Sequence, residues 1–143
     1  MNDNPSKPEF EDVCRALCGA FQGVLTWTWD SRFAAVLSEF AVARKDDICS
    51  TLEQYFGSAW DRSNIGNAPD FVRKIEGLFG GLWPGQSLLT TDPRRDALLF
   101  CTCWPWSDEK TISLRLGLTH KKRLPKSKKA EEIQQFKDWF GIQ

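Results

Sequence analysis

The chain has 143 residues, of which 41% are hydrophobic and 27% are charged, and its 19 basic and 19 acidic residues leave no formal net charge. This composition is typical of a folded globular domain and excludes a largely disordered chain. The charge balance argues against a protein whose whole surface binds nucleic acid or acidic membranes.

The N-terminal residues, the apolar runs and the cysteines predict the cellular compartment of the protein. Residues 1–11 are polar and lack the basic and apolar parts of a secretion signal. No apolar run is long enough to span a bilayer. Five cysteines cannot all pair within one chain, which favours a reducing compartment. We therefore expect a soluble cytoplasmic protein with no membrane partner.

The first part of the chain predicts a helix followed by a hairpin. Residues 1–7 are expected to form a flexible tail, and residues 8–143 a single globular domain. Apolar residues at helical spacing predict a helix over 8–22, and alternation predicts a strand over 24–30. Residues 32–42 suit either a return strand or a helix, and the short preceding turn favours the strand.

The rest of the chain predicts further helices and strands. In chain order these are a helix from Asp46 or Asp47 to Gly57, a loop over 58–68, a helix from Pro69 to Gly80, strands over 87–91, 97–104 and 111–119, a basic linker over 120–129, and a helix over 130–140. The resulting order is α-β-β-α-α-β-β-β-α. It predicts an α+β fold in which helices cover an antiparallel sheet of four to five strands.

The cysteines and the single histidine are the candidate reactive groups. Cys14 and Cys18 share a helix face, and Cys101 and Cys103 share a strand face, but neither pair has the spacing of a zinc knuckle. These four are therefore expected to be small core residues, with no metal or cofactor bound. A small Cys/His enzyme, in which His120 acts with a cysteine, is an alternative function. Because no recognisable catalytic set is present, we predict no catalytic residue.

Cys49 is the candidate cysteine for such an enzyme, because it stands near a predicted helix start, where the helix dipole would lower the pKa of its thiol. Carboxylate pairs elsewhere fall in predicted turns and helix starts, so they indicate capping and turn geometry instead of acid–base catalysis.

A basic run is the densest charge feature of the chain. It comprises Lys121, Lys122, Arg123, Lys126, Lys128 and Lys129. These side chains can contact phosphates, and Trp104 and Trp106 on the preceding strand could stack on bases. Nucleic-acid contact through residues 121–129 is therefore an alternative function, which the zero net charge of the chain makes less favoured.

Seven tryptophans against one tyrosine are the compositional outlier. Trp27 and Trp29 are expected to fill the core face of the sheet beneath helices. Trp104 and Trp106 flank Pro105, which cannot donate a ladder hydrogen bond and therefore marks an edge or a strand end. Exposed tryptophans are typical of interfaces.

The surplus of indole surface and the lack of a recognisable catalytic set favour a non-enzymatic binding module. Its partner would be another protein or a second copy of the chain. The predicted binding residues are Trp83, Trp104 and Trp106, with Arg94 and Arg95 as charges at their rim.

Overall fold

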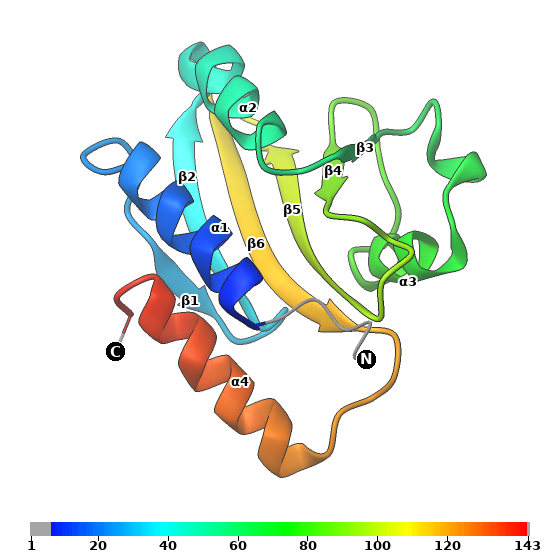
Figure 1. The fold of residues 1–143 in the computed structure, drawn as a ribbon. Coiled ribbons are helices and arrows are strands. Elements are labelled where there is room, and N and C mark those ends of the chain that lie inside the picture. Colours follow the sequence, from blue (N-terminus) through cyan, green and yellow to red (C-terminus); the bar gives the residue numbers. More distant parts are fainter. Residues whose placement is uncertain (1–6, 143) are drawn as a thin grey trace.

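The protein is built around a six-stranded antiparallel sheet, seen in a computed structural model that describes residues 7–142 (Figure 1). The strand order is β1-β2-β6-β5-β4-β3. The strands are β1 (Thr28–Asp30), β2 (Ala35–Ala41), β3 (Ser58–Trp60), β4 (Ser87–Thr90), β5 (Ala97–Pro105) and β6 (Thr111–His120). Since the longest strands, β5 and β6, are central, they provide most of the surface on which helices pack.

Within the described residues, four α-helices cover the two faces of this sheet unequally. They are α1 (Lys7–Ala20), α2 (Lys45–Glu53), α3 (Asp70–Leu78) and α4 (Lys126–Trp139), with short 3-10 turns at Val42–Arg44 and Ile65–Asn67. Apolar side chains of α1, α2 and α4 join one large buried cluster, whereas those of α3 join a second cluster. In Figure 1, α1 crosses in front of the sheet and α4 runs below it, beside β1.

Strand β5 belongs to both clusters because its side chains alternate between the two faces. Leu99 and Cys101 are fully buried in the large cluster, whereas Leu98 and Phe100 pack in the second one with α3. This explains why residues 97–104 form a nearly continuous apolar run, as expected of a strand covered on both faces.

Trp27 and Trp29 pack at the margin of the large cluster. Both indoles are half-buried and lie edge-on to aromatic rings at the end of α4, Trp27 against Phe140 at 5.0 Å and Trp29 against Phe136 at 6.5 Å between centroids. They therefore pack against the end of α4 at the edge of the large cluster, and they are not the buried members of the core face that the sequence predicts.

The predicted mixed fold with an antiparallel sheet is confirmed, and so is the return strand within 32–42, which is β2 paired with β1. The predicted strand count and order are wrong in detail. The sheet has a sixth strand, β3, within the expected loop 58–68, and β1 begins only at Thr28. The expected basic linker 120–129 is helical from Lys126 onward. The predicted tail falls largely on residues 1–6, which lie outside the described residues.

The local reasons for these differences are physical. Strand β3 has three residues, too few to show a period, and it exists because β4 offers a pairing edge. Helix α4 starts early because Pro125 stands just before its first turn, and a proline there fits the backbone of a helix start. None of the helices within residues 7–142 combines the length and the apolar character needed to cross a bilayer.

Candidate binding surface

Three tryptophans gather where β5 ends and where β4 and β6 begin, and we call this region the aromatic end. Trp83 precedes β4, Trp104 lies near the end of β5, and Trp106 follows that strand. The side chains of Trp83 and Trp106 are 65% and 44% exposed, whereas Trp104 is half-buried. The aromatic end therefore offers indole surface to solvent from two separate loops.

Trp104 anchors the aromatic end to the second cluster. Its ring lies 5.3 Å from the ring of Phe79, measured between centroids, and Phe79 in turn packs 5.7 Å from Phe100. Aromatic pairs at these separations are stabilising beyond the area that they bury. Trp104 is therefore both a packing residue and a partly exposed one, which sequence spacing alone does not reveal.

Trp106 is held in place by its own polar edge. Its indole Nε1 donates a hydrogen bond of 2.6 Å to the hydroxyl of Ser113, and its backbone N donates to the carbonyl of Thr111 at 2.8 Å. The turn that follows is tied by the Asp108 carboxylate, which accepts hydrogen bonds from the backbone of Lys110 and Thr111. Because these contacts restrain the ring, its exposed face requires little ordering when it meets another molecule.

The loop that carries Trp83 is a tight turn against the end of β5. The backbone N of Trp83 donates to the side chain of Gln86 at 2.8 Å, and Gly85 has a φ of +86°, which favours glycine. A Cβ built at Gly85 would lie 3.6 Å from the ring of Pro105. The two tryptophan-bearing loops are therefore neighbours in space.

A cleft of about 820 Å³ borders the same turn, and we call it the charged cleft. It lies between α2 and the loops after β3 and before β4, and its walls carry charges of both signs. Its lining comprises Lys45, Asp46, Cys49, Glu53, Asp61, Arg62, Ser63 and residues 84–87. Hydrogen bonds from Ser63 lower the pKa of Asp61, so that this wall stays anionic.

The cysteines are packing residues of the large cluster. Cys14, Cys101 and Cys103 are buried there, and Cys18 packs against it, as expected from the sequence. The expected lowering of the Cys49 pKa is wrong. Its hydrogen bond with Cys103 and its desolvation raise that pKa, and it stands mid-helix in α2, away from the positive end of the helix dipole. Within residues 7–142, no three potential ligands cluster to hold a metal ion.

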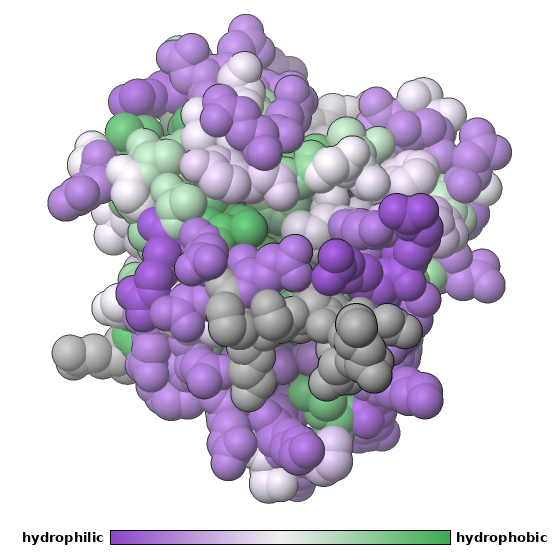
Figure 2. All heavy atoms as spheres, in the orientation of Figure 1, coloured by the Kyte–Doolittle hydropathy of each residue, from purple (hydrophilic) through white to green (hydrophobic). Residues whose placement is uncertain are grey.

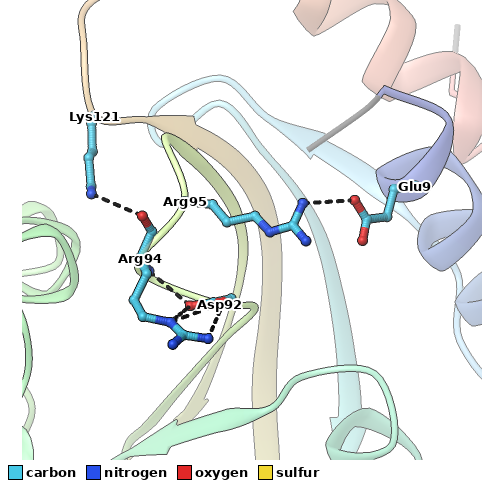
Figure 3. Close-up of polar contacts among 5 residues, drawn as sticks. All are labelled: Glu9, Asp92, Arg94, Arg95 and Lys121. Carbon is cyan, nitrogen blue, oxygen red and sulfur yellow. Dashed lines mark hydrogen bonds and ion pairs between the residues drawn. The ribbon is translucent and has the colours of Figure 1, made fainter. Parts of the chain in front are cut away.

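Arg94 and Arg95 do not flank the predicted tryptophans, because they lie in the turn before β5, at the far end of that strand from Trp104. Figure 3 shows how they are engaged. Arg94 forms an ion pair of 2.9 Å with Asp92, and Arg95 reaches Glu9 of α1 at 3.3 Å. These arginines therefore tie the β4–β5 turn to its surroundings and do not contribute to the rim of the aromatic end.

The basic run lies at that same far end. Lys121 follows β6, and its ammonium reaches the carbonyl of Arg94 at 3.4 Å (Figure 3). The same ammonium lies over the ring of Phe71. Because β6 pairs His120 with Ala97 and Ser113 with Trp104, seven residues of strand, or about 23 Å, separate the run from Trp104. The structure therefore does not bring Trp104 and Trp106 beside the basic run.

His120 is likewise remote from Cys49. Its Nε2 lies 2.7 Å from the carboxylate of Glu132 on α4, near the start of β5, whereas Cys49 neighbours Cys103 near the end of that strand. The histidine and this cysteine therefore do not share a site.

Sequence reasoning missed a polar and aromatic group on the α3 face of the sheet. Arg115 pairs with Asp30 at 2.9 Å, and its guanidinium lies 5.2 Å from the ring centroid of Phe33. Phe33 stacks on Phe79 at 4.5 Å, which links this group to Trp104. Its signal was present in the sequence, since Arg115 is the single charge at the odd positions of an alternating strand.

The face of the molecule that is turned to the viewer in Figure 1 is largely polar. Figure 2, in the orientation of Figure 1, shows a face on which most of the coloured surface is hydrophilic and the hydrophobic areas are small and separate. Together, the sheet, the helices on both of its faces and the aromatic end define an α+β protein with a localised aromatic surface. No protein-family model matches the chain, and neither the curated proteins nor the solved structures include a significant match.

Proposed function

We propose that this chain is a non-enzymatic module that binds a protein partner through its aromatic end. The observation that carries the proposal is the exposure of two indoles, Trp83 and Trp106, from adjacent restrained loops beside the half-buried Trp104. Tryptophan is enriched among the residues that contribute most to binding energy, particularly where the ring is rigid before binding.

The charges around the aromatic end favour a protein surface as the ligand. The turn after Trp106 carries Asp108, Glu109 and Lys110, and the charged cleft beside Trp83 carries both signs as well. A mixed polar rim around an apolar centre is typical of protein–protein interfaces. A nucleic-acid surface would instead require an excess of positive charge close to the aromatic rings.

The experiment places a photo-crosslinking amino acid at position 83 or 106 of the full chain in its native cells, and the captured proteins are identified by mass spectrometry. We expect one defined partner at both positions, or the chain itself if the module self-associates. The affinity of the purified pair should fall at least about 30-fold in the Trp83→Ala, Trp106→Ala double variant, because hot-spot tryptophans contribute about 2 kcal/mol or more.

The matched control is Val24, an apolar side chain that is 37% exposed and lies before β1, at the opposite edge of the sheet from β3. A crosslinker there should not capture the same protein, and Val24→Ala should leave the affinity unchanged. Circular dichroism must show that the double tryptophan variant is folded. Equal capture from position 24, or undiminished affinity of a folded double variant, would refute the proposal.

A further inference from the structure

A second hollow lies at the far end of the sheet, where four positive side chains converge from separate elements. It has a volume of about 210 Å³, and we call it the basic cleft. Lys74 comes from α3, Lys122 and Arg123 from the loop after β6, and Lys129 from α4. The cleft is independent of the aromatic end and of the function proposed for it.

The four positive charges have no counterions within the described chain. Each of these side chains belongs to an exposed residue, and none forms an ion pair with a carboxylate of residues 7–142. The acidic side chain that lines the cleft, Glu132, is engaged by His120 at 2.7 Å. Like charges that share a small hollow repel one another, so an anion between them would lower the free energy of the folded state.

The start of α4 adds to this positive potential. Leu124 and Lys129, which stand on either side of that start, both line the cleft. The first turn of α4 contains no acidic residue, and no side chain caps it. The positive end of the helix dipole is therefore not neutralised locally, and it favours an anion on the same side as the four cations.

The size of the cleft limits the ligand. Pockets for drug-sized molecules are typically about 300–1,000 Å³, so a hollow of about 210 Å³ suits a compact group. We propose that the basic cleft is a binding site for a small phosphate-bearing ligand, with Lys74, Lys122, Arg123 and Lys129 as phosphate contacts. Arginine suits phosphate because its planar guanidinium can donate two parallel hydrogen bonds.

A nucleic acid is the less favoured occupant. Recognition of single strands combines a basic groove with aromatic rings on which bases stack, and Trp104 lies about 23 Å along the sheet from this cleft. One compact hollow can hold one phosphate group, whereas a strand needs a row of contacts. The geometry therefore points to a single phosphate and not to a polymer.

The experiment titrates the uniformly ¹⁵N-labelled full chain with inorganic phosphate while sodium chloride keeps the ionic strength constant. We expect saturable shifts of the backbone amides of Lys122, Arg123 and Lys129. Lys74→Gln and Arg123→Gln should each weaken the affinity about two- to fivefold, and Glu132→Gln should tighten it by a similar factor, because it removes the negative charge beside the site.

The matched control is Lys110→Gln, which removes the same charge from the turn at the other end of β5 and β6. It should leave the phosphate affinity unchanged. Shifts that do not saturate, or an equal loss in Lys110→Gln, would overturn the proposal. A ten-nucleotide single-stranded DNA that binds over 100-fold tighter than phosphate, with a salt dependence of several ions, would overturn it in favour of nucleic acid.

Discussion

At the scale of single residues, Gly117 shows how closely the two central strands approach on the α3 face. Gly117 pairs with Phe100 across β5 and β6, and the phenyl ring lies over the glycine. A Cβ built at Gly117 would lie 2.5 Å from Cζ of Phe100. Real Cβ atoms are not found that close to another heavy atom. The ring of Phe100 can therefore lie in its place beneath α3 only because residue 117 has no side chain.

Replacing Gly117 by alanine should therefore destabilise the protein by about 1–3 kcal/mol, because the phenyl ring or the strand must shift in a close-packed core. The measurement is the free energy of unfolding in urea. The matched control is Gly19→Ala in α1, where the added methyl group meets nothing within 4 Å. That change should stabilise by about 0.5–1 kcal/mol. Equal stability of Gly117→Ala and the wild type would show that Phe100 does not occupy this position.

Asp92 provides a prediction on pH. Hydrogen bonds from the side chain and backbone of Arg94 lower the pKa of Asp92 to about 2. Because the folded pKa lies below the unfolded value of about 3.9, the stabilisation is present above pH 4 and is lost as the pH falls toward 2. We expect the carboxyl carbon of Asp92 to titrate in NMR near pH 2. In Arg94→Ala the midpoint should rise but stay below about 3.9, because that variant keeps the backbone N–H that donates to Asp92. An unchanged midpoint in that variant would exclude Arg94 as the cause.

At the scale of elements, the sequence predicted those whose residues carry a full period. Alternation over 111–119 and helical spacing over 8–22 correspond to β6 and α1 within two residues. Strand β3 could not be predicted, because three residues hold no pattern and its pairing depends on β4, about 30 residues away. The early start of α4 was hidden by its lysines, whose charge resembles that of a solvated linker.

Helix α4 carries unfavourable charges at its beginning. Its first turn is basic, with no acidic residue and no side-chain cap, while Lys137 lies in its last turn. We expect Lys128→Glu to stabilise the protein by about 0.3–1 kcal/mol, because a negative charge suits the positive end of the helix dipole. Thermal unfolding at low salt is the measurement.

The same charge reversal at the C-terminal end of α4 should destabilise the protein. Lys137→Glu places a negative charge near the negative end of the dipole, and it also removes an ammonium that lies 5.5 Å from the ring centroid of Trp29. The changes in stability caused by Lys128→Glu and by Lys137→Glu should both be smaller in 1 M salt. Destabilisation by Lys128→Glu would mean that the helix dipole does not determine which charge is favoured at the start of α4.

At the scale of the whole molecule, the sites depend on the pairing of distant segments, and this limits what a sequence can show. Trp83 was predicted together with Trp104 and Trp106, but only the last two are grouped by their spacing; Trp83 lies near them because the turn before β4 packs on Pro105. Conversely, Arg94 and Arg95 are close to Trp104 in the sequence, yet the extended length of β5 separates them. The basic cleft needs α3, β6 and α4 together, and no local pattern specifies that meeting.

The two buried clusters lie on opposite faces of one sheet, and this arrangement predicts how the protein unfolds. Because β5 sends Leu99 and Cys101 into one cluster and Leu98 and Phe100 into the other, neither cluster can lose this strand without disrupting its counterpart. We expect a single cooperative transition in urea. Far-UV circular dichroism, tryptophan fluorescence and the reaction of the buried thiols Cys14 and Cys101 with a thiol reagent should share one midpoint. A fluorescence change that precedes thiol exposure would contradict a single transition, because it would show that part of the packing around the tryptophans is lost while the large cluster still buries Cys14 and Cys101.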